Sequence, residues 1–312
     1  YWSDYQTNEQ YFGLLSFDPG EEESACYPDG DKSEWTEGDL VSEQDGVRLS
    51  MRYDERYLYF LVEQEGFDLQ ADKLYIPIDT TPKSGSSRAG NLGVEMDREA
   101  DFVVELDGRD NSRIWVQEYY DGIEALFYDK ITPWDLFSQT FPERDTDTFV
   151  KIRLLIQKDL YFVRDSLEDQ NYLDDKSIPY AEYDQRNPMH YSRMENYETG
   201  KLAYGNGNPN RPDFHSLADF CAGDGFVELR LPWQLLNVAD PSRMNIHDDY
   251  YAHYGVEYLH IEHLYAGAGD GTGRIAMEPF ALEPLGRRPE FHERLKVSYY
   301  MLRALWTEYP AA

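Results

Sequence analysis

Residues 48–79 read RLSMRYDERYLYFLVEQEGFDLQADKLYIPID and carry the strongest indication of the fold. In residues 48–53, polar and apolar side chains alternate, which is the pattern of a strand with one buried face. In residues 57–62, every side chain is apolar or aromatic, so we expect a central strand covered on both faces. The polar residues 54–56 between these segments are long enough only for a hairpin turn.

The same stretch ends in a third apolar segment at residues 74–78. Because Pro77 has no backbone N–H to donate to a strand ladder, we expect this strand at the edge of a sheet or at a bulge. Further alternating segments occur at residues 101–106, 113–119 and 150–156. Short strands separated by Asp, Gly and Pro turns predict an all-β fold, an antiparallel and jelly-roll-like β-sandwich, and not an α/β fold.

We expect a single domain over residues 1–312, with a long inserted loop region at residues 158–222 and a C-terminal helix. The insertion is polar, rich in Tyr and Asn, and has little periodicity. A loop of this length inside a compact domain is usually functional or disordered, and the aromatic residues argue against simple disorder. The helix is predicted from the helical spacing of Phe291, Leu295, Ser298, Tyr299, Leu302 and Trp306.

The composition is strongly acidic, with 60 Asp and Glu residues against 29 Lys and Arg residues and a net charge of −31. Such a charge repels nucleic acid and anionic membranes, and it suits neutral ligands and divalent cations. Solubility alone is the alternative explanation. Because no apolar run approaches the ~18 residues of a membrane span, we expect no direct insertion into a membrane. The chain begins without Met and without a signal peptide, so we expect a piece of a longer protein.

Cys26 and Cys221 are the two cysteines of the chain. They form either one disulfide or two buried thiols, and their spacing does not distinguish these alternatives. Two cysteines alone do not make a zinc site without help from His or carboxylate side chains.

Four segments of the chain resemble, in the same order, family 9 carbohydrate-binding modules and their relatives. The segments are DGDKSEW at residues 29–35, the Asp54 turn that leads into YLYFLV at 57–62, DKLYIPID at 72–79, and GFVELRLPW at 225–233. The resemblance implies an antiparallel β-sandwich, often with a structural calcium ion, that binds sugars in some members. Trp35 and Trp233 fall within these scaffold segments, and we expect both to pack in the core.

Neutral sugars are usually held between aromatic rings and hydrogen-bonding side chains, which predicts a ligand site where such residues gather. We expect residues 185–210 of the insertion to fold over the strand at 113–119. One wall of the site is then formed by Trp115, Tyr119 or Trp134, and the other by Tyr191, Arg193, Asn196 and Tyr204. The alternatives are that Trp115 is a core residue under the insertion and that the insertion satisfies its own hydrogen bonds.

Acidic turns offer the oxygen ligands that Ca²⁺ prefers. Asp29, Asp31 and Glu34 are close in sequence and are our candidate calcium ligands, although the chain has no EF-hand pattern. With so many acidic residues, a solvated turn is the alternative.

We therefore expect a non-catalytic carbohydrate-binding domain of a larger secreted or cell-surface bacterial protein, with a neutral glycan as partner. No motif selects catalytic residues: Gly-x-Ser-x-Gly is absent, and residues 269–273 lack the Lys-Ser/Thr ending of a phosphate loop. Two alternatives stay open. One is a polysaccharide-active enzyme, either a glycoside hydrolase or a lyase, and the other is a structural ectodomain that binds protein.

Overall fold

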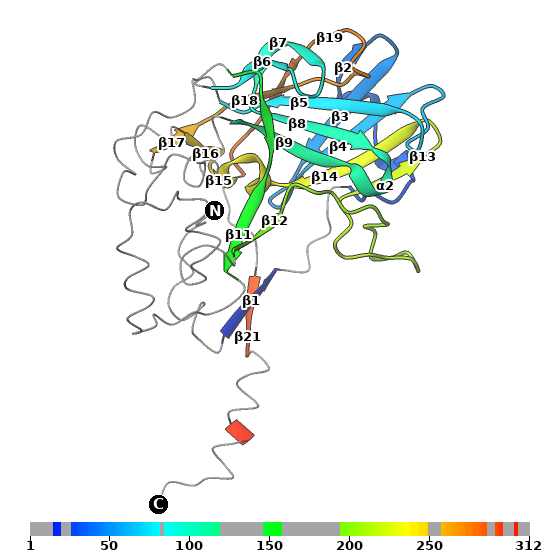
Figure 1. The fold of residues 1–312 in the computed structure, drawn as a ribbon. Helices are drawn as coiled ribbons and strands as arrows, with labels where there is room; N and C mark the ends of the chain where they lie inside the picture. Colours follow the sequence, from blue (N-terminus) through cyan, green and yellow to red (C-terminus); the bar gives the residue numbers. More distant parts are fainter. Residues whose placement is uncertain are drawn as a thin grey trace, which may run out of the picture.

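The computed structural model describes residues 15–19, 26–81, 84–118, 146–157, 194–248, 257–285, 291–295 and 303–304. The strands in these residues form two large antiparallel sheets and four smaller ones (Figure 1). Apart from residues 303 and 304, the helices of the described residues are single turns, namely η1 (Lys32–Glu34), η2 (Glu37–Asp39), α2 (Gly108–Asn111) and η4 (Trp233–Leu236). The prediction of an all-β, antiparallel sandwich is confirmed.

The first large sheet has five strands in the order β13-β14-β4-β3-β2. Its strands are β2 (Leu40–Gln44), β3 (Val47–Tyr53), β4 (Tyr57–Gln64), β13 (Phe220–Gly223) and β14 (Phe226–Pro232). The predicted hairpin joins β3 to β4, and the Asp54 carboxylate closes it by accepting from the backbone N–H groups of Arg56 and Tyr57 at 2.8 and 3.0 Å. As predicted, β4 lies inside the sheet and is buried along most of its length.

The second large sheet has six strands in the order β10-β9-β8-β5-β18-β20. Its strands are β5 (Lys73–Asp79), β8 (Phe102–Asp107), β9 (Arg113–Gln117), β10 (Phe149–Lys151), β18 (His263–Ala266) and β20 (Glu278–Ala281). The chain therefore crosses between sheets after β4, so the third segment of residues 48–79 lies opposite the first two.

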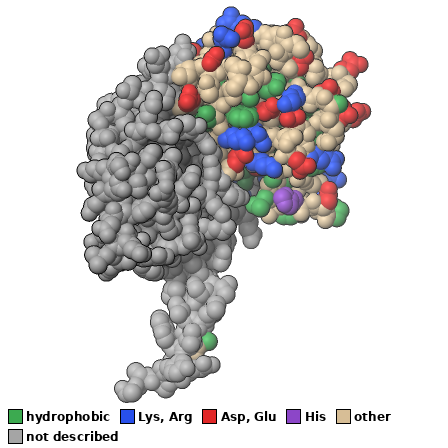
Figure 2. Space-filling view, in the orientation of Figure 1, with side chains coloured by type: hydrophobic (Ala, Val, Ile, Leu, Met, Phe, Trp, Pro, Cys, Tyr) green, Lys and Arg blue, Asp and Glu red, His purple; other side chains and the backbone are tan. Residues whose placement is uncertain are grey.

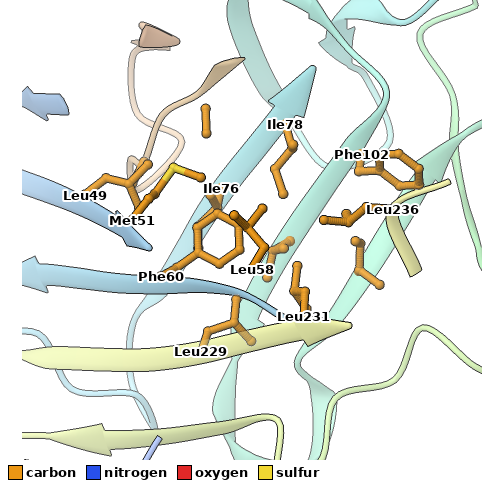
Figure 3. Close-up of a cluster of buried hydrophobic side chains, with 14 of the residues drawn as sticks. Leu49, Met51, Leu58, Phe60, Ile76, Ile78, Phe102, Leu229, Leu231 and Leu236 are labelled. Atoms are coloured by element: carbon orange, nitrogen blue, oxygen red, sulfur yellow. The ribbon is translucent and has the colours of Figure 1, made fainter. Parts of the chain in front are cut away.

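The main hydrophobic core lies between the two large sheets. Figure 3 shows side chains of both sheets pointing toward one another, with Leu58 and Phe60 of β4 facing Ile76 and Ile78 of β5. All four of these side chains are fully buried. Trp233 belongs to this core and is also fully buried, as predicted, while Trp35 is only partly buried.

A second core covers the other face of the six-stranded sheet. There Tyr75 and Val103 pack with Val94, Met96 and Ile275. The last three belong to a small sheet of order β19-β7-β6, which gathers at the top of Figure 1. Its strands are β6 (Ser86–Ala89), β7 (Val94–Ala100) and β19 (Arg274–Ile275). Strands β5 and β8 are consequently buried on both faces.

The remaining strands form short sheets beside the sandwich. These are β1 (Leu15–Pro19) with β21 (Phe291–Leu295), β11 (Arg153–Gln157) with β12 (Met194–Glu198), and β15 (Val238–Asp240) with β16 (Asn245–Asp248) and β17 (Glu257–His260). The part of the predicted insertion that the structure describes, residues 194–222, includes β12 and the beginning of β13.

The predicted edge position of Pro77 is wrong, because β5 lies between β8 and β18. The missing N–H falls opposite Gly267, just beyond the end of β18. The neighbouring pair, Tyr75 and Gly269, exchanges two backbone hydrogen bonds of 2.8 and 3.0 Å. The pair of Pro77 and Gly267 makes a single bond of 3.4 Å from the Gly267 N–H. The ladder therefore loses one bond where the chain leaves β18 for a glycine-rich loop.

The C-terminal helix is not present where it was predicted to begin. Residues 291–295 form β21, which pairs antiparallel with β1, so that Leu15 lies opposite Leu295. The helical spacing of apolar residues in this segment was overridden by pairing with a strand from the other end of the chain. Of the later residues, only 303 and 304 are described, and these are helical.

The two cysteines are separate thiols. Cys26 and Cys221 are both buried and unbonded to each other. Burial raises the pKa of the Cys26 thiol to about 12 and also raises the pKa of Cys221. Both side chains therefore stay protonated at neutral pH.

The most deeply buried acidic group among the described residues, Asp101, lies between β7 and β8. Its carboxylate accepts from the Thr80 N–H at 2.7 Å, the Thr80 hydroxyl at 3.0 Å, the Thr81 N–H at 3.0 Å and the Ser84 hydroxyl at 2.9 Å. Burial raises the pKa of Asp101 to about 8, and the nearby charge of Asp79 contributes. Burial also raises the pKa of Asp79 to about 6, against the effect of its ion pair with Arg98.

These raised pKa values predict that the free energy of unfolding falls as the pH rises from about 4 to about 8. Well below pH 3.8 both carboxyl groups are protonated in the folded and unfolded states. Between their ordinary pKa of 3.8 and the raised values of about 6 and 8, the unfolded chain loses protons that the folded protein retains.

Urea unfolding at several pH values between 5 and 8 measures this effect. Added salt is the control, because about 0.5 M NaCl screens repulsion between surface acids but not the cost of ionising buried ones. The midpoint should still fall with pH at high salt. A midpoint that is constant or that rises contradicts the prediction.

Candidate functional site

Trp115, the aromatic residue that we predict to stack on a sugar, lies on the outer face of the six-stranded sheet. It pairs with Val103 of β8 on one side and with Lys151 of β10 on the other. Its neighbours Ile114 and Val116 point into the main core, whereas Trp115 packs against the edge of the second core and is partly exposed. This alternation follows from the period-2 geometry of β9.

Charged side chains fix the orientation of the indole. The Trp115 ring N–H donates to the Glu105 carboxylate at 3.0 Å, and the other Glu105 oxygen accepts from Lys73 at 2.9 Å. Lys73 also lies 2.9 Å from Asp107. Hydrogen bonds to Glu105 and Asp107 raise the pKa of Lys73, so this ammonium stays charged.

On the other side of Trp115, the guanidinium of Arg113 lies 5.4 Å from the centre of the ring. Arg113 pairs with Glu198 at 3.0 Å, and Lys151 lies 3.7 Å from the same carboxylate. We call this surface the Trp115 face, defined by Trp115, Lys73, Glu105, Asp107, Arg113, Lys151 and Glu198. In Figure 2, Lys and Arg side chains are interspersed with Asp and Glu side chains on the visible surface of the described residues.

The structure does not bring Tyr204 to the Trp115 face. Its ring makes an edge contact with Phe220, with 5.3 Å between ring centres, and packs against the main core. Arg109 lies 4.4 Å from the centre of the Tyr204 ring. Asn196 lies on β12, paired with Leu155 of β11. The other predicted site residues, Tyr119, Trp134, Tyr191 and Arg193, lie outside the described residues.

The predicted calcium ligands lie on one turn but bind protein donors. Asp29 accepts from the side-chain N–H of Asn208 at 2.7 Å and pairs with Arg211 at 3.4 Å. Asp31 pairs with Arg211 at 3.2 Å, and Glu34 accepts from a backbone N–H at 3.3 Å. Among the described residues, no three His, Cys, Asp or Glu side chains gather closely enough to hold a metal ion. The calcium site stays a prediction.

The structure assigns a scaffold role to Glu228, which the sequence showed only as the acidic residue inside the apolar strand β14. Its buried carboxylate accepts from the backbone N–H groups of Asp29 and Gly30 at 3.1 and 2.8 Å and from the Trp35 ring N–H at 3.2 Å. Burial raises the pKa of Glu228 to about 8, while the hydrogen bond from Gly30 lowers it. One carboxylate therefore fastens residues 29–35 to the sheet.

The turn at residues 29–35 and strand β14 both contact the loop at residues 206–218. Asn206 accepts from the Asn208 N–H at 2.9 Å and donates to Asp213 at 3.1 Å. Arg230 of β14 donates to the backbone carbonyls of Ala218 and Ser216 at 2.9 and 3.4 Å. Figure 1 shows this loop, in yellow-green, projecting from the region of β13 and β14.

No family model, no curated protein and no solved structure matches this chain. We therefore infer a function from the side chains of the surfaces described in this section.

Replacing Glu228 by Ala is expected to lower the free energy of unfolding by roughly 3 kcal/mol, because three N–H donors lose their acceptor in a buried position. Urea unfolding followed by tryptophan fluorescence measures the loss. The matched control is Glu278→Ala, since Glu278 is exposed on β20 and its replacement should change the stability by no more than about 0.5 kcal/mol. Equal stability of the two variants contradicts the role given to Glu228.

Proposed function

We propose that this protein is a non-catalytic carbohydrate-binding domain that takes a neutral glycan on the Trp115 face. The observation that supports the proposal is the fixed, partly exposed indole of Trp115, whose ring N–H is held by Glu105 among paired charges. A fixed ring offers an apolar surface to the C–H side of a sugar. The surrounding carboxylate, ammonium and guanidinium groups offer partners to its hydroxyls.

The charges around Trp115 favour a neutral ligand over an ionic one. Lys73 is engaged by Glu105 and Asp107, and Glu198 is engaged by Arg113 and Lys151. An anionic ligand would have to break these pairs and approach a chain of net charge −31. A neutral glycan requires neither, because its hydroxyls both donate and accept hydrogen bonds without displacing a charge.

The expected affinity is low. Stacking a sugar face on one ring contributes about 1–2 kcal/mol from the apolar area buried, at ~25 cal/mol per Å². With a few charge-assisted hydrogen bonds, the total reaches the range of roughly micromolar to millimolar dissociation constants. Such weak binding suits a reversible tether, and we propose that the domain serves a larger secreted or cell-surface protein in this way.

The described residues contain no helix that is long and apolar enough to span a bilayer.

Affinity electrophoresis in gels containing soluble neutral polysaccharides such as xylan, mannan or mixed-linkage β-glucan tests the proposal. We expect at least one polymer to slow the protein, and Trp115→Ala to remove most of that retardation. Trp115→Phe should keep packing against the second core but lose the bond to Glu105, and should bind with intermediate strength. Tyr258→Ala is the matched control, because Tyr258 is 55% exposed on β17, which belongs to a different sheet.

Full retardation of a folded Trp115→Ala protein contradicts the proposed site. Turnover of any of the polymers, measured as new reducing ends, contradicts the non-catalytic role.

A structural calcium ion is a separate proposal for the turn at residues 29–34. Hydrogen bonds from Ser33 lower the pKa of Asp31, so its exposed carboxylate is ionised and available to Ca²⁺ in competition with Arg211. Millimolar Ca²⁺ added after EDTA treatment should raise the melting temperature of the wild type by mass action. The same addition should leave Asp31→Asn unchanged. Identical melting curves of the wild type in Ca²⁺ and in EDTA refute the proposal.

A further inference from the structure

The loop at residues 206–218 exposes two apolar side chains. Large hydrophobic side chains are exposed at three positions in the described chain, and two of these positions, Phe214 at 44% and Leu217 at 73%, lie in this loop. The third is Tyr258, on β17. Single exposed hydrophobic residues need no explanation, but two within four residues of one loop form a small apolar surface.

Backbone hydrogen bonds order the part of the loop that carries these two residues. The backbone N–H of Phe214 donates to the carbonyl of Arg211 at 3.2 Å, and the N–H of His215 donates to the carbonyl of Asn206 at 2.7 Å. The N–H of Ala218 donates to the carbonyl of His215 at 3.0 Å. The backbone on each side of Phe214 and Leu217 is therefore hydrogen-bonded within the loop.

Ion pairs and hydrogen bonds tie the loop to the sandwich. Arg211 pairs with Asp29 and Asp31, the Gly207 N–H donates to the carbonyl of Pro28 at 2.8 Å, and Arg230 binds two loop carbonyls. Gly207 packs so closely that an added methyl group would lie 2.9 Å from the Pro28 ring. Because the loop is already ordered, a ligand that contacts Phe214 would not have to order it, which favours binding.

Exposed polar side chains flank Phe214 in the sequence. Asn210, Arg211, Asp213 and His215 are all exposed, as are the other residues from 209 to 217. They provide an amide, a guanidinium, a carboxylate and an imidazole within four residues of Phe214. The loop segment that carries the exposed ring therefore also carries exposed hydrogen-bond donors and acceptors.

The size of this surface and the charge of the chain indicate which kind of ligand it binds. A stable protein interface buries about 800 Å² on each partner, far more than one Phe and one Leu side chain supply. A second copy of the chain would bring together two molecules that each carry a net charge of −31. Anionic ligands meet the same repulsion. A single ring of a neutral sugar matches both the small apolar area and the polar border.

We propose that Phe214 is a second stacking surface, on which one ring of a neutral glycan lies with its C–H face on Phe214 and against Leu217. Its hydroxyls bind the exposed side chains of residues 210–215. This inference rests on the proposed function for the class of ligand, but the residues are separate from the Trp115 face. A polysaccharide that engages both surfaces gains avidity without any new contact.

Affinity electrophoresis with the same neutral polysaccharides tests the inference, using Phe214→Ala, Trp115→Ala and the double variant. Each single change is expected to weaken retention about tenfold, which corresponds to ~1.4 kcal/mol, and the double change to abolish it. Phe214→Tyr keeps a ring and should bind like the wild type, and Tyr258→Ala is again the control. Melting curves establish that each variant is folded.

The outcomes separate the two proposals. If Phe214→Ala binds like the wild type while Trp115→Ala does not, the second surface is refuted and the proposed function stands. If Phe214→Ala alone loses binding, the second surface stands and the Trp115 face is refuted. If no polymer retards the wild type, both fail. Self-association in sedimentation that Leu217→Ala abolishes also refutes the inference, because the loop is then an interface between copies.

Discussion

The burial of both faces of β5 and β8 is the constraint on which the rest of the structure depends. Their inner faces give Ile76 and Val104 to the main core, and their outer faces give Tyr75 and Val103 to the second core. A polar group enclosed in this way is costly unless it is hydrogen-bonded. This is why Asp101, which directly precedes β8, accepts hydrogen bonds from four donors. Polar side chains that a ligand can reach are therefore found at the margins of the sandwich.

The Trp115 face differs in charge from the chain as a whole. The chain carries a net charge of −31, but the acids of this face are matched by Lys73, Arg113 and Lys151. Pairing keeps these side chains oriented, and it removes the attraction that unpaired cations would have for anionic molecules. Hydrogen-bonding capacity without net local charge is the property that a site for a neutral ligand needs.

Two segments far apart in the chain, residues 29–35 and 206–218, are held on β14 by a few polar contacts. Glu228 fastens the turn at residues 29–35, that turn pairs with Arg211 of the 206–218 loop, and Arg230 holds the end of the loop. The loop contains no strand or helix between residues 206 and 218. Its order therefore comes from hydrogen bonds within the loop and from its contacts with residues 28–31 and with Arg230.

Strand positions and the buried face of each strand could be predicted from sequence, because side-chain alternation is a local property of the backbone. The segments at residues 48–53, 57–62 and 74–78 became β3, β4 and β5, and Trp233 became a core residue. The residues around Trp115 were harder to predict. Lys73, Glu105 and Glu198 come from three different strands, and no spacing in the sequence relates them.

The local pattern of side chains in the sequence could not predict which strands pair with one another. Pro77 is tolerated inside a sheet because its missing N–H lies just beyond the end of β18, a fact about residues almost two hundred positions away. Residues 291–295 have helical spacing yet pair with β1. In the sequence Glu228 is an isolated acidic residue, and only the structure shows that the turn at residues 29–35 donates hydrogen bonds to it. Period and propensity are properties of neighbours in sequence, whereas hydrogen-bond partners, burial and charge pairing depend on neighbours in space.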